Sequence, residues 1–213
     1  RDAEALKALK NSLTLAISSS LLATVIGTFA ALGIDRMRSK HLKGALTSIT
    51  NIPMMNPDIV TGVSMMLLFV AASSLSFLPI KFGMGTMLIA HTTFNLPYVI
   101  LSVLPRFKQM DKHLTEAALD LGCTPALSFF KVELPSIMPG VISGLMLGFT
   151  LSLDDFVISY FTSSTDQNLS MIVYSAARRG IEPTMYALST IMFLVILILL
   201  LAVNRRTNLE ELR

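Results

Sequence analysis

Five stretches of this chain are long and apolar enough to cross a lipid bilayer, and this feature constrains the fold more than any other. A bilayer core about 30 Å thick needs roughly 20 apolar residues in a helix. The most apolar stretch, Ile191 to Val203, carries no polar side chain. Apolar residues make up 53% of the chain and charged residues only 15%, which excludes an ordinary soluble domain. We therefore expect an all-α integral membrane protein with spans near residues 12–34, 59–79, 84–105, 137–161 and 186–204.

Basic residues predict which ends of these spans face the cytoplasm. Four Lys or Arg residues lie in 35–57, four in 106–136 and three in the C-terminal tail, whereas six lie at the opposite ends. Because basic loops stay on the cytoplasmic side, we expect 35–57, 106–136 and the C-terminus there. Residues 1–10 and 162–185 then lie outside. A complete chain that starts in the cytoplasm needs one more span, upstream of Arg1.

A charged, amphipathic segment, residues 111–131, separates two of the apolar stretches. Asp111 is placed to cap a helix that ends at Gly122, since glycine accepts the positive φ of a C-terminal cap. Thr124 and Pro125 have the residue types of an N-cap and a first helical position, which predicts a second short helix. An apolar stripe follows the first helix at helical spacing: Leu114, Ala117, Ala118 and Leu121.

This helix pair has two interpretations on physical grounds. A pair that projects from the cytoplasmic face and is apolar on one side fits a groove on a partner protein. Alternatively, the pair lies on the membrane or packs on its own bundle. We expect Pro135 and Pro139 to end the second helix and to lead into the next span.

The same segment resembles the EAA motif of bacterial ABC-importer permeases. The matching residues are Glu116, Ala117, Ala118, Gly122, Leu134 and Pro135, with Val132 where the family usually has Ile. Residues 56–69, 91–100, 149–161 and 185–191 further resemble the spermidine/putrescine permeases, specifically the second permease subunit. The resemblance covers nearly the whole chain, as a single permease domain over residues 1–213.

The resemblance implies a function, a location and a set of partners. The motif is expected to dock on an ATP-hydrolysing subunit, and the domain to have six spans, of which the first precedes Arg1. The partners would be a dimer of ATP-binding subunits, a second permease subunit and an external substrate-binding protein. The chain would lie in the bacterial plasma membrane with its C-terminus in the cytoplasm. It would hold no cofactor, since ATP and Mg²⁺ bind the partner.

Two adjacent acids, Asp154 and Asp155, fall inside the fourth predicted span. A carboxylate in mid-membrane is costly unless it is paired or faces water, and neighbours on a helix point about 100° apart. They either line a path for cations or make structural hydrogen bonds that fix the rotation of the span. Tyr160 and Tyr98 are candidates for cation–π contacts, with plain packing as the alternative.

Other polar residues have more ordinary interpretations. Asp58 is a weaker candidate for the path, because Asn56 as N-cap and Pro57 as first residue predict an ordinary helix start there. His91 and Asn95 are four residues apart, and we expect them to make interhelical hydrogen bonds rather than to bind a ligand.

Small and charged residues mark two further features. Gly144 and Gly148 have the spacing of a close helix–helix approach. Arg178, Arg179 and Glu182 lie in the outer segment, where they contact either a substrate-binding protein or solvent.

The motifs that the sequence lacks narrow the class of function. The chain has no phosphate-binding loop, no metalloprotease or serine-hydrolase motif, and one cysteine, Cys123. Its net charge of +3 is small and says nothing about nucleic acid, and we expect no nucleic-acid partner. An intramembrane acid enzyme is disfavoured because Asp154 and Asp155 are sequence neighbours, while a scaffold would tolerate their neutral replacement. Permeases for ferric iron, thiamine or phosphonate share the coupling motif and remain the alternative, although an acid pair has the wrong sign for an oxyanion.

Overall fold

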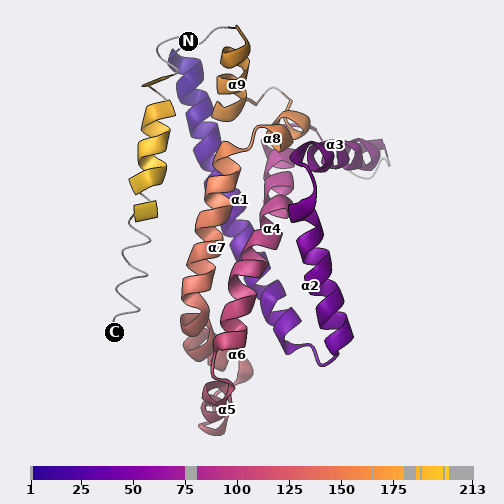
Figure 1. The fold of residues 1–213 in the computed structure, drawn as a ribbon, viewed down its shortest axis with the longest axis vertical. Coiled ribbons are helices and arrows are strands. Elements are labelled where there is room, and N and C mark those ends of the chain that lie inside the picture. Colours follow the sequence, from indigo (N-terminus) through magenta and orange to yellow (C-terminus); the bar gives the residue numbers. More distant parts are fainter. Residues whose placement is uncertain are drawn as a thin grey trace.

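The computed structural model describes residues 2–74, 81–164, 166–179, 186–187, 189–198 and 200–201, and these contain helices and no strand. The helices are α1 (Asp2–Arg36), α2 (Lys40–Met55), α3 (Asp58–Ser74), α4 (Met84–Gln109), α5 (Lys112–Asp120), α6 (Pro125–Ser128), the π-helical turn η1 (Phe129–Glu133), α7 (Leu134–Asp154), α8 (Val157–Thr162) and α9 (Leu169–Arg179) (Figure 1). A further short apolar helix covers Ser189–Ile198. The all-α prediction is confirmed.

Helices α1, α4 and α7 form the central bundle, and small residues let them approach closely. A side chain at Gly27 of α1 would place its Cβ 2.7 Å from Val99 of α4. On α7, a Cβ at Gly144 would lie 3.1 Å from the Val99 Cα, and one at Gly148 would lie 3.4 Å from Asn95. The predicted close approach at Gly144 and Gly148 is therefore confirmed, with α4 as the partner helix.

The expected loop 35–57 is wrong for most of its length, because α2 occupies residues 40–55. The Ser39 hydroxyl caps this helix by accepting a hydrogen bond from the Leu42 amide at 3.4 Å. Asn56 ends α2 as its C-cap and is not the N-cap of α3, which begins at Asp58 after Pro57. Proline cannot continue the hydrogen-bond ladder of α2, and the chain turns here.

The second predicted span, 59–79, begins with α3, and this 17-residue helix is too short to count as a span by itself. Helices α2 and α3 meet at an angle of 104°, and they qualify as a membrane span only as a bent pair. In Figure 1, α2 runs beside the bundle and α3 lies across its end. Residues 75–79 of the predicted span lie outside the described residues.

Three single helices are long and apolar enough to span a bilayer: Glu4–Arg36, Met84–Gln109 and Pro125–Asp154. The first and second of these contain the predicted spans 12–34 and 84–105. The fourth predicted span, 137–161, ends earlier than expected, because α7 stops at Asp154 and α8 follows after a break. Of the fifth, 186–204, the structure describes only part, which includes the helix Ser189–Ile198.

The helix before α7 does not end at the prolines, which corrects a second expectation. Helix α6 continues through η1 into α7, so that Pro135 and Pro139 lie within one helical segment. The Leu134 amide bonds to the Phe129 carbonyl, and this wider turn directly precedes Pro135, which has no amide hydrogen to donate.

The two ends of the bundle carry different helices. Helices α5 and α6 lie at one end, together with the turn between α1 and α2 (Figure 1). Helices α3, α8 and α9 lie at the other end, near the start of α1. We refer to them as the α5–α6 end and the α8–α9 end. This arrangement agrees with the predicted grouping of the basic segments, since Arg36, Lys43 and Lys108 all belong to elements that meet at the α5–α6 end.

Candidate functional site

The caps of α5 and α6 are those that the sequence predicts. The Asp111 carboxylate accepts a hydrogen bond from the His113 amide at 3.0 Å, and Thr124 Oγ1 accepts one from the Leu127 amide at 3.3 Å. Gly122 has a φ of +86°, and its amide bonds to the Leu119 carbonyl at 2.9 Å. Glycine suits this position because other residues are strained in the left-handed region. The two short helices are thus fixed by local contacts.

The motif residues of this pair divide between solvent and the protein. The side chain of Glu116 is 70% exposed and lies 3.3 Å from His113 Nδ1. Ala117 is exposed, whereas Ala118 is buried. Leu134 packs against the bundle core, and Pro135 is exposed. The predicted stripe therefore does not share one environment, because its Ala118 faces the protein.

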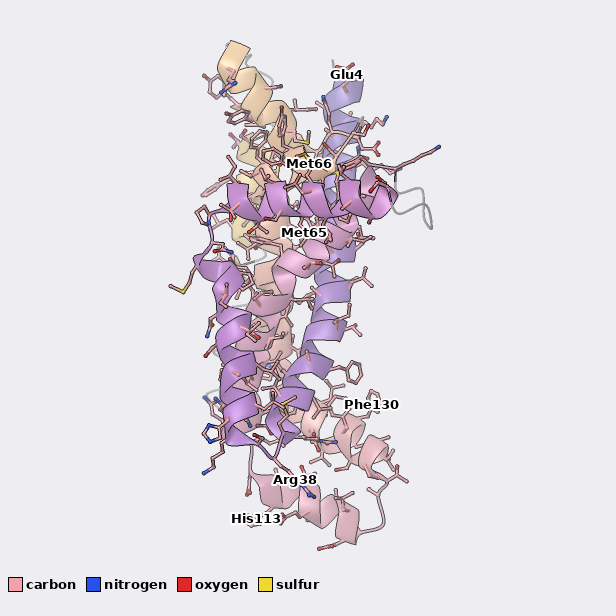
Figure 2. The ribbon with its side chains drawn as sticks, turned by 90° about the vertical axis from the view of Figure 1, so that its right-hand side faces the viewer. Glu4, Arg38, Met65, Met66, His113 and Phe130 are labelled. Carbon is pink, nitrogen blue, oxygen red and sulfur yellow. The ribbon has the colours of Figure 1, made fainter. Side chains whose placement is uncertain are left out.

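Large apolar side chains remain exposed around these helices. Leu114 is 50% exposed, Leu121 86% and Phe130 58%. Figure 2 shows Phe130 and His113 pointing away from the bundle at the α5–α6 end. We define the α5–α6 face by its exposed members Leu114, Glu116, Ala117, Leu121, Leu127 and Phe130. Exposed apolar side chains that gather in one region are a common feature of interaction surfaces.

At the opposite end, the two aspartates occupy different environments. Asp154 is the last residue of α7, and its neighbour Asp155 has extended backbone angles, with φ −66° and ψ 118°. The expectation that both lie in one continuous mid-membrane helix is wrong. The 21 residues of α7 rise about 30 Å, the thickness of a bilayer core, so Asp154 sits at the far end of that rise from α5 and α6.

Asp155 is engaged in structural hydrogen bonds. Its carboxylate accepts from the amides of Ile158 at 3.3 Å and Ser159 at 2.9 Å, which are otherwise unpaired donors in the first turn of α8. Its side chain is only 6% exposed. Asp154, by contrast, is exposed, and within the described residues no ion pair involves it. Of the two acids, Asp154 is the one available to a ligand.

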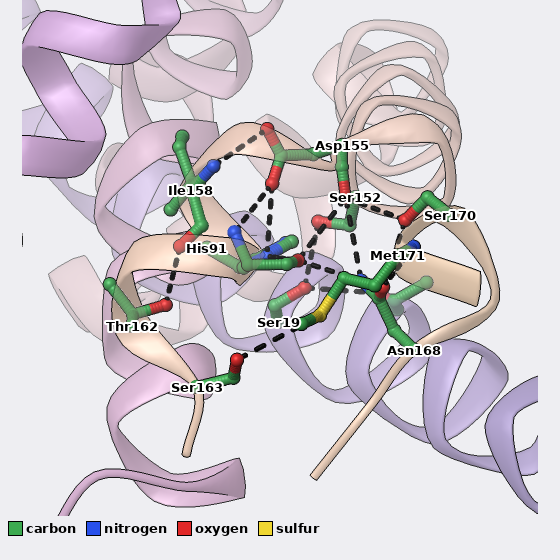
Figure 3. A network of polar contacts seen from close by, with 12 residues as sticks. Ser19, His91, Ser152, Asp155, Ile158, Thr162, Ser163, Asn168, Ser170 and Met171 are labelled. Atoms are coloured by element: carbon green, nitrogen blue, oxygen red, sulfur yellow. Dashed lines mark hydrogen bonds and ion pairs between the residues drawn. The ribbon is translucent and has the colours of Figure 1, made fainter. Parts of the chain in front are cut away.

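His91 and Asn95 make the interhelical hydrogen bonds that their spacing predicts. His91 Nε2 lies 2.9 Å from Ser159 Oγ of α8 and 3.5 Å from the Asp155 carboxylate. The Asn95 amide donates to Ser152 Oγ of α7 at 2.8 Å. Figure 3 shows the polar network that these contacts form inside the bundle. It fixes the break between α7 and α8 against α4.

The sequence analysis did not identify several members of this network. Asn168 donates to Ser159 Oγ at 2.7 Å, and Ser152 Oγ lies 3.0 Å from Ser19 Oγ of α1. Ser12 accepts from the Leu169 amide at 2.8 Å. Serine and asparagine are common, and these partners are far apart in the sequence. No local signal distinguishes them from other polar residues.

Aromatic rings gather after the helix break. Phe156 stacks on Tyr174 of α9 with centroids 4.0 Å apart, and Tyr160 lies 5.5 Å from Phe156. The guanidinium of Arg178 lies 5.3 Å above the Tyr174 ring. Tyr160 is 58% exposed, as its predicted role requires. Phe156 and Tyr174 were not predicted, because α9 was expected to be part of an outer loop.

The weaker candidates lie nearby but separately. Asp58 is exposed in the first turn of α3, one turn before Gly62, which packs directly on α8. Tyr98 is half-buried on α4, and its ring lies 5.5 Å from that of Phe94. Of the outer charged residues, Arg178 is exposed on α9, and Glu182 lies outside the described residues.

Among the described residues, no group of three His, Cys, Asp or Glu side chains is arranged to hold a metal ion. Cys123 is a free, half-buried thiol between α5 and α6.

Curated relatives resemble this chain over most of its length. The putrescine transport system permease protein PotI of Escherichia coli K12 is 40% identical over 192 residues, which cover 90% of this chain and 68% of that protein. The spermidine/putrescine transport system permease protein PotC of Haemophilus influenzae is 36% identical, with coverages of 93% and 76%. PotC of Escherichia coli K12 is 37% identical, with coverages of 92% and 72%.

Solved transporter structures share the fold. A chain of the MetNI methionine ABC transporter in inward-facing conformations superposes with a TM-score of 0.76 at 18% identity, covering 95% of this chain and 94% of that one. A chain of a bacterial ABC transporter that imports the polysaccharide alginate gives 0.74 at 17% identity, with coverages of 95% and 78%.

A family model also matches most of the sequence. Residues 23–208 match the inner membrane component of binding-protein-dependent transport systems. The relatives, the fold and this match agree with the motif at α5 and α6. The chain therefore belongs to the family of binding-protein-dependent transport system inner membrane components.

Proposed function

We propose that this chain is one permease subunit of an ATP-driven importer and forms half of a translocation path for polyamines such as spermidine and putrescine. Its partners in this proposal are a second permease subunit, a pair of ATP-binding subunits and an external substrate-binding protein. ATP and Mg²⁺ are bound by the ATP-binding subunits. The names of the relatives support the substrate class, since both putrescine and spermidine transport occur among them.

The observation that carries the substrate assignment is the exposed carboxylate of Asp154 at the end of α7. A polyamine is a flexible chain with two or more ammonium groups, and it loses hydration when it enters a membrane protein. A carboxylate at the entrance offsets part of that loss, since opposite charges attract more strongly where water is partly excluded. Phosphonate is an anion, and this acid disfavours it.

An aromatic ring, that of Tyr160, is exposed in α8, the helix that follows Asp154 and Asp155. An ammonium group binds favourably over an aromatic face. Phe156 stacks on Tyr174 and Arg178 lies over the same ring, so the exposed ring of Tyr160 is the one left for an ammonium group. We assign Asp154 and Tyr160 to the path, and we assign Asp155 to the structural role of holding α8. Asp58 and Tyr98 are secondary candidates for the path.

The α5–α6 face is the proposed docking surface for an ATP-binding subunit. Its leucines and Phe130 are exposed on short helices at the end of the bundle, and apolar helix faces of this type bind in grooves on partner proteins. ATP binding would close the pair of ATP-binding subunits and displace α5 and α6. Because α6, η1 and α7 are one continuous helical segment, this displacement would reach Asp154 at the other end.

The experiment that tests the substrate class is uptake by the complete importer in proteoliposomes. Labelled spermidine and putrescine should accumulate when ATP is supplied, and unlabelled polyamines should compete. Ferric iron, thiamine and phosphonate should not compete. Competition by one of these three, without uptake of either polyamine, would refute the polyamine assignment and favour the alternative importer.

A further inference from the structure

A partly buried ion pair joins η1, the segment after α6, to the end of α1. Arg36 Nη2 donates to both carboxylate oxygens of Glu133, at 2.8 and 3.0 Å. The Glu133 side chain is 4% exposed, whereas that of Arg36 is 50% exposed. A carboxylate this well buried depends on its cation, because an unpaired buried charge is strongly unfavourable.

The position of this pair connects two elements that neither sequence motif nor chain connectivity joins. Arg36 is the last residue of α1, and Glu133 is the last residue of η1. At the start of η1, Phe129 is buried in the core and its ring lies 5.8 Å from that of Phe29 on α1. The turn is therefore attached to α1 at both its ends, by an apolar contact and by an ionic one.

A second ion pair continues the connection from α1 to α2. Lys43 Nζ lies 2.8 Å from the Asp35 carboxylate and also donates to the Asp35 backbone carbonyl at 2.9 Å. None of the residues of α2 is buried, and apart from α1 this helix packs mainly against α4. Leu46 of α2 packs partly on the core. Since α2 leads directly into α3, the end of α1 is linked to the helix that packs on α8.

Arg36 also has room to change position. A cavity of about 450 Å³ separates the end of α1 from α5 and α6, and Arg36, Glu133 and Glu116 all line it. In Figure 2, Arg38 lies in this region, between α1 and α5. A guanidinium beside open space can shift relative to its carboxylate without a clash with packed side chains. The pair is therefore able to take up more than one arrangement.

We propose that the ion pairs Arg36–Glu133 and Asp35–Lys43 form a relay that transmits displacement of α5 and α6 to α2 and α3. Arg36 and Glu133 are positioning residues in this relay and do not touch the substrate. The relay rests on the proposed function, because it requires an ATP-binding subunit at the α5–α6 face. It gives that function a second mechanical route, in addition to the continuous segment that ends at Asp154.

The relay makes a specific prediction about energy coupling. Glu133→Gln removes the charge but keeps the shape, and it leaves Arg36 half-exposed to water, so the variant should fold. In the complete importer with its substrate-binding protein, the ratio of ATP hydrolysed to spermidine transported should rise at least about fivefold. Association with the ATP-binding subunit should remain unchanged. Arg38→Gln is the matched control, because Arg38 lines the same cavity without an ion pair among the described residues, and its ratio should not change.

Exchange of the two charges separates transmission from a merely structural role. The double variant Arg36→Glu with Glu133→Arg should recover a ratio within about threefold of the wild type. An unchanged ratio in Glu133→Gln would overturn the relay. If that variant does not assemble, Arg36→Lys and Arg36→Gln decide the question: coupling kept by lysine and lost by glutamine supports the relay, and equal coupling in both overturns it.

A distance measurement tests the relay without reference to the substrate. Spin labels at Ile49→Cys of α2 and Met138→Cys of α7, with Cys123→Ser, report the separation of these helices; both sites are exposed. ATP trapped with vanadate should change this distance in the wild type and not in Glu133→Gln. An equal change in both would overturn the relay. A wild-type importer that shows the change but takes up no spermidine would refute the proposed substrate and leave the relay supported.

Discussion

At the α5–α6 end, each helix begins or ends at a capping residue that bonds to an amide or carbonyl only a few positions away, and large apolar side chains face outward. At the α8–α9 end, the break between α7 and α8 is held by His91, Ser159 and Asn168, which come from three separate parts of the chain. The first end is locally determined and exposed, as a docking surface must be. The second is determined by tertiary contacts, which bury Asp155 and leave the carboxylate of Asp154 exposed. In the proposed function, the surface that docks the ATP-binding subunit and the surface that recognises the solute therefore lie at opposite ends.

The largest expected effect comes from the structural acid at the α8–α9 end. Asp155→Ala removes the acceptor of two amides in α8 and should destabilise the protein by about 2–3 kcal/mol. The thermal midpoint of the purified importer should fall, together with the yield of assembled complex. Asp155→Asn keeps an acceptor and should lose less. An alanine variant as stable as the wild type would show that the network does not hold the break.

A substitution at the α5–α6 end should cost less and act on docking. Gly122→Val forces a branched side chain into a left-handed backbone position, at a cost of about 1–2 kcal/mol. We expect weaker retention of the ATP-binding subunit in a pull-down and a loss of uptake, with normal membrane insertion. Ala118→Asp, which buries a charge under the same helix, should act in the same way.

Two variants serve as controls for this effect. Gly122→Asn should retain more binding, since asparagine tolerates the left-handed region better than valine does. Gly33→Ala changes a glycine of α1 with open space around it and should have no effect. Retention of the ATP-binding subunit at the wild-type level by Gly122→Val and Ala118→Asp would remove this end from the docking surface.

The free acid should affect transport without affecting stability. Asp154→Asn is nearly isosteric and should lower polyamine uptake per assembled complex about tenfold, which corresponds to about 1.4 kcal/mol. Its thermal midpoint should match the wild type, in contrast to that of Asp155→Ala. Asp58→Asn should give a smaller reduction. Wild-type uptake by Asp154→Asn would leave the polyamine assignment dependent on the relatives alone.

The smallest expected effect is a difference in thiol labelling between the two ends, and it shows which end faces the cytoplasm. An impermeant thiol reagent applied to intact cells should not label Cys123, whereas inverted vesicles should expose this half-buried thiol. Ser164→Cys, at an exposed position next to α8, should show the opposite pattern in a Cys123→Ser background. Labelling of Cys123 from outside the cell would reverse the proposed orientation of both ends.

Features at the α5–α6 end could be predicted from the sequence, whereas those at the α8–α9 end mostly could not. The caps at Asp111, Gly122 and Thr124 were predictable because a cap depends on a few neighbouring residues. The break after Asp154 was not, because a hydropathy window averages composition and cannot detect a single extended residue inside an apolar stretch. The different environments of Asp154 and Asp155 depend on where Ile158 and Ser159 place their amides, which only the folded chain determines.

Helix α2 was not predicted, for a different reason. Residues 40–55 carry basic and hydroxyl side chains, and a positive-charge count places them in a loop. Such a count gives sidedness and says nothing about backbone conformation, so the N-cap at Ser39 was overlooked. The glycine contacts of α7 were predicted correctly, since the spacing of Gly144 and Gly148 needs only the period of a helix and a close neighbour.

The wide turn η1 has a consequence for how such chains can diverge. A π-helical turn holds one more residue than an α-helical turn, and one residue corresponds to about 100° of rotation. The extra residue therefore sets the azimuth at which α5 and α6 leave the bundle. Deleting one residue between Phe129 and Glu133 would keep both short helices and all of α7 intact but would aim the exposed leucines in a different direction. Permeases that differ by one residue in this turn should accordingly pair with ATP-binding subunits whose grooves are rotated to match.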